Sequence, residues 1–141
     1  MKNVSKLVVR MGLLSLLSVM PLAAQIDNGV NFTTSFPFYA GNAKMPAGSY
    51  KITQSDMDES ILQIQSNDGV HSALLEFIPT QSAQPHPHSD VTFHKYRNTE
   101  YLNRIWIQGQ EYGMKVDPTK AETKAAENTS VVEHSVSGGL R

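Results

Sequence analysis

The sequence predicts a mainly β protein, an antiparallel β-sandwich or small open barrel of about six to seven strands with one short C-terminal helix. Two observations support this prediction. Short segments rich in Val, Ile, Phe and Tyr alternate with clusters of Gly, Pro, Asn and Ser, which is typical of all-β chains. One stretch rich in Ala, Lys and Glu, residues 119–127, supplies the helix.

The N-terminus has the three-part pattern of a secretory signal peptide, predicted at residues 1–24. Lys2, Lys6 and Arg10 form a positive leader, an apolar run follows from residue 11, and Ala24 is the expected cleavage site. The apolar run is about 10 to 14 residues long, whereas a stable membrane span needs about 20. We therefore expect export to the periplasm or the medium, with no stable membrane span after the signal is removed.

The composition of the mature chain excludes several classes of function. Without the leader's three basic residues, nine basic residues stand against 13 acidic ones, a net charge of −4. An acidic chain with no basic stripe argues against nucleic acid as a partner. The absence of cysteine removes disulfides, thiol catalysis and thiolate metal sites. No cofactor is predicted.

Residues 25–127 are predicted to form a single β domain. Residues 30–36 alternate between apolar and polar side chains, as a half-buried strand does, and Pro37 ends that strand. Residues 41–48 are a turn-rich connection. Further strands are expected at residues 49–54, 61–65 and 70–78, with a hairpin turn at Asn67-Asp68-Gly69.

A proline-rich polar loop, residues 79–89, precedes a second predicted hairpin of residues 90–96 and 101–108. A two-residue turn at Asn98-Thr99 would place Tyr96 opposite Tyr101 and His94 opposite Asn103. The other face of this hairpin would then carry the apolar residues Val91, Phe93, Leu102 and Trp106.

The C-terminal helix is expected to begin with Asp117 as its cap and Pro118 at its first position. Its apolar face consists only of alanines, so its packing is expected to be weak: Ala121, Ala125 and Ala126. Residues 128–141 are polar and contain a Gly-Gly pair, and they are predicted to be a disordered tail.

Three segments resemble a family of small exported bacterial β-rich proteins of unknown function. Residues 37–50 are similar to the family's PF…G…LPAGxY segment, and residues 93–106 to its FHRYGxxYFL…W hairpin. The helix opening at Asp117 is similar to a closing polar helix that follows a Gly turn. The resemblance covers about residues 30–127 and implies export and a β-rich domain, without any activity.

His86 and His88 flank Pro87, and His94 follows closely, so the three histidines are the candidate metal ligands. A His-x-His pair in an extended chain places both imidazoles on one side, which suits Zn²⁺ or Cu²⁺. The alternative is a solvated loop together with a packed His94, paired with Asn103 or a tyrosine. A mobile loop orders metal ligands only at an entropic cost.

Tyr96, Tyr101, Arg104 and Trp106 are the candidate ligand or partner face. Aromatic rings with a neighbouring arginine can bind a sugar or another flat ligand. The alternative is ordinary core packing with a surface cation, since aromatic residues in strands are mostly buried.

Other patterns carry little chemistry. The acidic turn formed by Asp56, Asp58, Glu59 and Ser60 begins like a calcium loop, but Ile61 and Asn67 stand where the loop needs Gly and Glu. No nucleophile elbow, phosphate loop or zinc-protease motif is present. The sequence therefore predicts an exported, non-enzymatic domain that binds an envelope protein or a small ligand. The alternative is a zinc- or copper-binding exported protein that uses the histidine loop.

Overall fold

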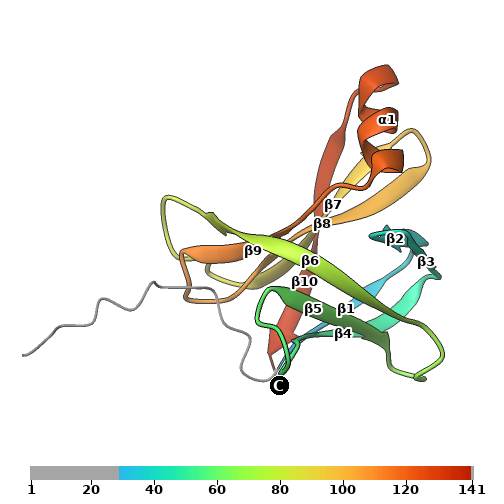
Figure 1. The fold of residues 1–141 in the computed structure, drawn as a ribbon. Helices are drawn as coiled ribbons and strands as arrows, with labels where there is room; N and C mark the ends of the chain where they lie inside the picture. The colour runs from blue at the N-terminus through green and yellow to red at the C-terminus, as the bar shows by residue number, and fades with distance from the viewer. Residues whose placement is uncertain (1–28, 141) are drawn as a thin grey trace, which may run out of the picture.

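The computed structural model describes residues 29–140, which form a mainly β domain with one short helix (Figure 1). The predicted signal peptide, residues 1–24, lies outside the described residues. The elements are β1 (Val30–Thr34), β2 (Phe38–Ala40), β3 (Ala43–Met45), β4 (Gly48–Gln54), β5 (Ile61–Ser66), β6 (Ser72–Gln81), β7 (Ser89–Tyr96), β8 (Thr99–Trp106), β9 (Tyr112–Val116), α1 (Lys120–Asn128) and β10 (Val132–Leu140).

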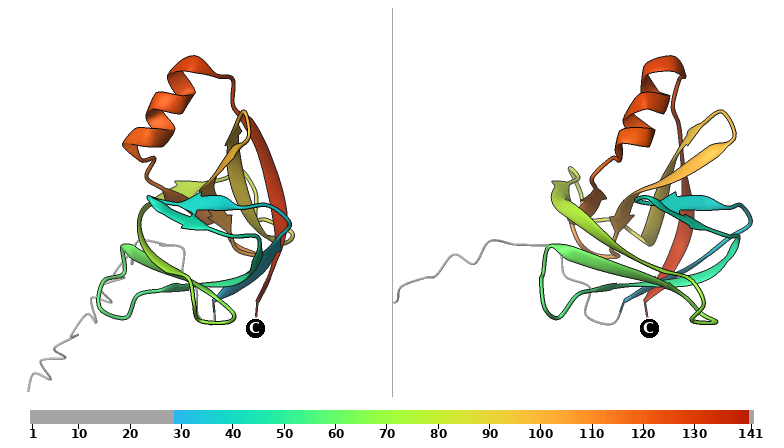
Figure 2. Two further views of the ribbon diagram at one scale, coloured as in Figure 1. Left: turned by 90° about the vertical axis from the view of Figure 1, so that its right-hand side faces the viewer. Right: turned by 45° about the vertical axis from the view of Figure 1, so that its right-hand side comes forward.

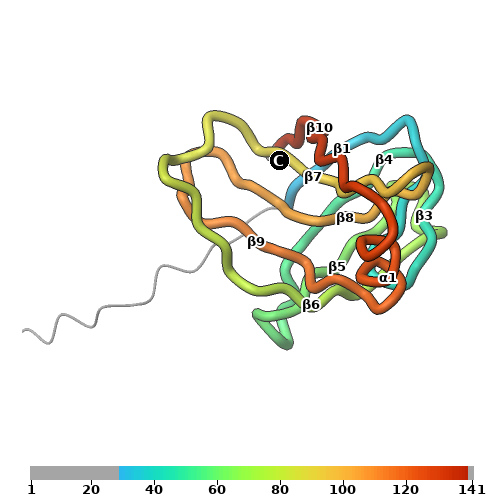
Figure 3. The backbone as a smooth tube through the Cα atoms, turned by 90° about the horizontal axis from the view of Figure 1, so that it is seen from above, coloured from blue at the N-terminus to red at the C-terminus, as the bar shows by residue number. Residues whose placement is uncertain are grey.

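Eight of the strands close into a barrel, in the order β8-β7-β10-β1-β4-β5-β6-β9, because β9 pairs with both β6 and β8. These pairings are all antiparallel, and β2 and β3 attach outside the ring, where β2 runs parallel to β8. Figure 3 looks onto this ring of strands. The prediction of a sandwich or open barrel of six to seven strands was therefore wrong in strand number and in closure. Closure removes the exposed edges that an open sheet would leave.

The chain after the helix is the largest correction, because the predicted disordered tail contains β10. This strand lies between β1 and β7 and pairs with both (Figure 1). Its backbone satisfies the hydrogen-bonding groups of two neighbours, although its own side chains are half-buried or exposed at residues 132–139. The backbone pairing needs no apolar side chains, so the polar composition of this segment did not indicate it.

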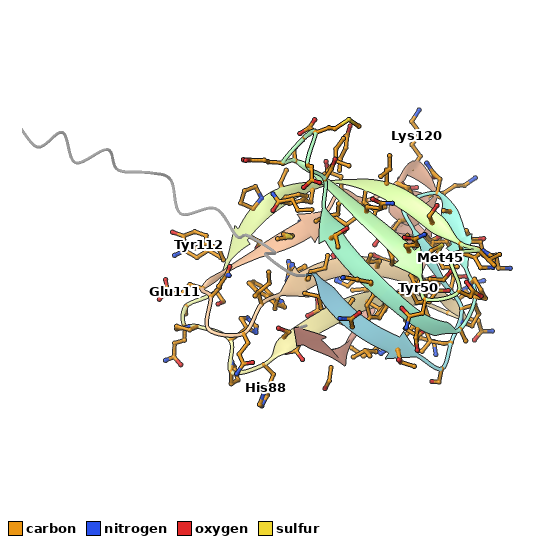
Figure 4. All side chains as sticks on the ribbon, turned by 90° about the horizontal axis from the view of Figure 1, so that it is seen from below. Met45, Tyr50, His88, Glu111, Tyr112 and Lys120 are labelled. Carbon is orange, nitrogen blue, oxygen red and sulfur yellow. The ribbon has the colours of Figure 1, made fainter. Side chains whose placement is uncertain are left out.

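The barrel interior is filled by a packed core of aromatic and aliphatic side chains. Phe32, Phe38, Tyr50 and Phe93 are at most 4% exposed, and the centroids of the rings that contact one another lie 5.1–6.2 Å apart. In Figure 4, Tyr50 and Met45 lie among the strands. The interior is thus occupied by the protein's own side chains, as in small barrels generally.

The β7–β8 hairpin turns one residue earlier than predicted. Its two turn residues are Arg97 and Asn98, and Arg97 adopts the left-handed backbone conformation with φ of 56°. Tyr96 therefore pairs with Thr99, and His94 pairs with Tyr101 rather than with Asn103. A β-bulge then shifts the register, because Phe93 pairs with Leu102 whereas Thr92 pairs with Arg104.

Helix α1 projects from one end of the barrel (Figures 1 and 2). Its cap is Thr119 rather than Asp117: the Thr119 hydroxyl accepts a hydrogen bond from the backbone N–H of Glu122 at 3.2 Å. Thr119 and Glu122 have the spacing of a capping box. The predicted alanine face is also wrong, because Glu122 is the buried residue of α1. Within residues 29–140, no helix is both long and apolar enough to cross a membrane.

Candidate functional site

The candidate site lies on the outer face of the β7–β8 hairpin. Val91 and Ile105 are both fully buried in the core and pair with each other, so the neighbouring Asp90–Trp106 pair faces outward. The bulge at Asn103 thus places Trp106 on the same outer face as Tyr101. The sequence placed Trp106 on the opposite face, with the core residues, because a bulge reverses the alternation of side chains beyond it.

The two tyrosines at the turn end of this face form a tight aromatic group. Tyr96 and Tyr101 are 7% and 8% exposed, and their ring centroids are 5.8 Å apart. Tyr39 on β2 stacks on the outer side of Tyr101 at 5.4 Å. Burial raises the pKa of both buried tyrosines, and the neighbouring Glu122 carboxylate raises it further. Both phenols therefore stay protonated at neutral pH.

Glu122 fixes α1 against these rings. Its carboxylate oxygen Oε1 lies 3.5 Å from the Tyr96 hydroxyl and 3.7 Å from Nδ1 of His94. Burial raises the pKa of Glu122, and the nearby His94, Tyr96 and Lys115 oppose that increase. A buried carboxylate, rather than apolar side chains, therefore joins the helix to the barrel.

His94 occupies the centre of this polar contact. Its Nε2 atom is 2.9 Å from Glu133 of β10 and 2.9 Å from the side-chain amide of Asn103. The predicted pairing of His94 with Asn103 is thus confirmed at the side-chain level, although the two residues are not opposite each other in the backbone register. With partners at both ring nitrogens, His94 connects β7, β8, β10 and α1.

An open groove of about 530 Å³ separates α1 from the hairpin. The two tyrosines line it on one side, and the helix lines it on the other. Two cationic side chains, Arg97 and Lys124, also border it. Within residues 29–140 neither cation has a hydrogen bond or ion pair from its side chain. Its full lining is Tyr96, Arg97, Thr99, Tyr101, Ala121, Lys124, Ala125, Asn128 and Thr129.

Trp106 lies at the other end of the same face, where the His86 ring covers it. The His86 ring stacks on it at 4.1 Å with an interplanar angle of 13°, and Trp106 is 8% exposed. Arg104 lies between Tyr101 and Trp106, and its Nε atom is buried without a hydrogen-bond partner among residues 29–140. The four predicted face residues thus share one face, but only Tyr96 and Tyr101 line the groove.

The three predicted metal ligands are not brought together. His86 stacks on Trp106, His88 is exposed and points away from the barrel (Figure 4), and His94 is held by carboxylates. Among the described residues, no group of three or more His, Asp or Glu side chains is arranged to hold a metal ion. The extended His-x-His geometry fails here because the stacking contact turns His86 towards β8.

The acidic turn is a local hydrogen-bonded structure. Asp58 Oδ1 accepts hydrogen bonds from the backbone N–H and hydroxyl of Ser60 at 2.9 and 2.6 Å. These hydrogen bonds, chiefly that of the hydroxyl, lower the pKa of Asp58. The turn is exposed and closes the connection between β4 and β5.

No protein-family model, curated protein or solved structure matches this chain. The resemblance to small exported bacterial proteins therefore stays a prediction.

Sequence reasoning missed three groups of the site: Glu122, Lys124 and the strained Arg97. The Thr119-x-x-Glu122 spacing was a signal for the helix start and for the inward position of Glu122. Lys124 and Arg97 carried no comparable signal, because a lone surface cation has no motif. Only the approach of α1 to the hairpin gives these two cations a common role.

Proposed function

We propose that this protein is an exported, non-enzymatic binding domain, located in the periplasm or outside the cell. It binds its ligand or partner in the groove between α1 and the β7–β8 hairpin. The groove is the single observation on which the binding proposal depends, because it joins two aromatic rings and two unpaired cations in one concave surface. Small-molecule sites generally have volumes of about 300–1,000 Å³, and this groove is within that range.

The packed interior supports a binding site on the outside. Barrels that carry a ligand inside leave a cavity between the strands, whereas this core is filled by side chains such as Phe93 and Tyr50. The contacts of His94 support binding rather than catalysis. A general base needs a ring nitrogen directed at a substrate, and both nitrogens of His94 face protein groups.

Export is supported by the leader, with its three basic residues and short apolar run. The test is the intact mass of the protein recovered from its native cells. We expect a chain that begins after Ala24 in the envelope or medium. Recovery of a chain that retains Met1 from the cytoplasm would contradict the proposal.

Binding in the groove is tested by NMR, with ¹⁵N-labelled protein titrated against glucose, glucuronate, glucose 6-phosphate and inorganic phosphate. We expect amide shifts confined to residues 96–101 and 121–129, which surround the groove. Shifts elsewhere, or none with any of these compounds at millimolar concentration, would contradict the proposed site.

A further inference from the structure

Most of the described lysines and arginines form no ion pair, and the two cations that border the groove are among them. Lys95 lies 4.0 Å from Glu100, and Lys115 lies close enough to Glu122 to lower its pKa. Arg97 and Lys124 have no such partner among residues 29–140, although acidic residues outnumber basic ones in the full sequence. Two uncompensated cations on one concave surface attract an anion, because a concave site of one sign concentrates its field.

Arg97 holds its position at a conformational cost. It is the non-glycine residue with positive φ among the described residues, and left-handed backbone is unfavourable for residues with a long side chain. Glycine would fit this turn without strain. Strained backbone persists where the surrounding structure enforces it and is often found at binding sites. Here the strained turn presents a guanidinium group at the rim of the groove.

The rest of the groove fits a ligand larger than a bare anion. Its volume of about 530 Å³ leaves room for an organic group beside the anionic one. Thr99, Asn128 and Thr129 line it with hydroxyl and amide groups, which pair with the hydroxyls of a sugar. The tyrosines are nearly buried and therefore present only a small part of their side chains to a ligand.

The acidic side chains next to the groove residues in the sequence, Glu100, Glu122 and Glu127, do not line the groove. Glu122 is 7% exposed and contacts the Tyr96 hydroxyl from behind, and it does not line the groove. Its carboxylate is 3.7 Å from His94, which is on the barrel side. The surface that a ligand would meet is therefore cationic.

We propose that the groove binds a sugar phosphate, with Arg97 and Lys124 holding the phosphoryl group and the polar lining holding the sugar hydroxyls. This inference rests on the proposed function, since it names the ligand class of the same groove. The guanidinium group suits phosphate because its planar donors can pair with two phosphate oxygens at once. Lys124 adds a second charge from the helix side.

The test is calorimetric titration of the purified protein with glucose 6-phosphate, glucose, glucuronate and inorganic phosphate at low ionic strength. We expect glucose 6-phosphate to bind most tightly, and its affinity to fall as salt is added. Lys124→Ala should lower the affinity for glucose 6-phosphate by about tenfold, as expected for the loss of one charged hydrogen bond. Lys120→Ala is the matched control, because Lys120 is on the same helix, points away from the barrel and does not line the groove (Figure 4).

Arg97→Gly separates binding from folding. The variant should bind glucose 6-phosphate about tenfold or more weakly than wild type. Its thermal unfolding midpoint should be unchanged or higher, because glycine removes the backbone strain of the turn. The inference would be overturned if glucose 6-phosphate bound with equal affinity to the three variants Arg97→Gly, Lys124→Ala and Lys120→Ala. Equal binding of glucose and glucose 6-phosphate would overturn it too, and leave the proposed function intact. No binding of any of the four compounds at millimolar concentration would contradict both.

Discussion

Gly113 on β9 is a position where one added methyl group should destabilise the barrel. A Cβ atom there would lie 2.5 Å from Cε3 of Trp106 and 2.7 Å from the carbonyl oxygen of Ile105. The backbone cannot shift to make room, because Gly113 pairs with Trp106 on one side and with Thr80 of β6 on the other. The Trp106 ring has little room to move, since His86 stacks on it.

The magnitude follows from two opposing effects in Gly113→Ala. Overpacking a tightly packed site costs about 1–3 kcal/mol. Replacing glycine with alanine lowers the conformational entropy of the unfolded chain, which stabilises the folded protein by about 0.4–1 kcal/mol. We therefore expect a net loss of about 1–2 kcal/mol. With a urea slope of about 1–3 kcal/mol per molar, the unfolding midpoint should fall by roughly 0.3–2 M.

Trp106 provides the assay, because it is the protein's single tryptophan. Urea unfolding of Gly113→Ala, followed by tryptophan fluorescence and circular dichroism, should show the lower midpoint together with altered native-state emission. Gly139→Ala is the matched control, since nothing lies within 4 Å of a Cβ atom there and its φ is not positive. If both variants unfold at the wild-type midpoint and emit like wild type, the close packing of Gly113 against Trp106 is refuted.

Three further predictions concern the helix and the core. Burial raises the pKa of Glu122 above its ordinary value of 4.5, so its carboxyl stabilises the fold at low pH and loses that contribution as pH rises through the folded pKa. Glu122→Gln should therefore gain stability relative to wild type as the pH rises above the ordinary pKa of 4.5, and parallel urea-midpoint curves would contradict this. Thr119→Ala should lose about 1 kcal/mol of helix stability with its cap, measured as faster amide exchange in α1, and unchanged exchange would exclude the cap. Phe93→Ala should cost about 3–5 kcal/mol by urea unfolding because Phe93 is fully buried, and a loss under about 1 kcal/mol would exclude this packing.

The sequence predicted most of the strands because apolar and polar side chains alternate along a strand that has one buried side. Residues 49–54 and 61–65 were expected as strands and became β4 and β5, since one side of each faces the core. The two short strands β2 and β3 were missed because they lie in a turn-rich segment of glycine and proline. The strand β9 was missed for a similar reason, because Gly113 interrupts its apolar pattern.

The candidate face was predicted only in part. Tyr96 and Tyr101 were correctly placed together at the turn end of the hairpin, because both registers keep them on one face. Trp106 was assigned to the wrong face, because the pattern of apolar residues in the sequence does not show where a bulge occurs. His86 and His88 were read as neighbours in an extended chain, and the contact of His86 with Trp106 comes from a different strand.

The sequence by itself determined the β class, the lack of disulfides and the presence of one short helix. These properties depend on composition and on side-chain alternation, which are local. The tertiary structure alone decided that the barrel closes, that the polar segment 132–140 becomes its last strand, and that Arg97 and Lys124 border one groove. Those features depend on backbone hydrogen bonds and approaches between segments far apart in the chain, and such contacts need no particular side chain to mark them.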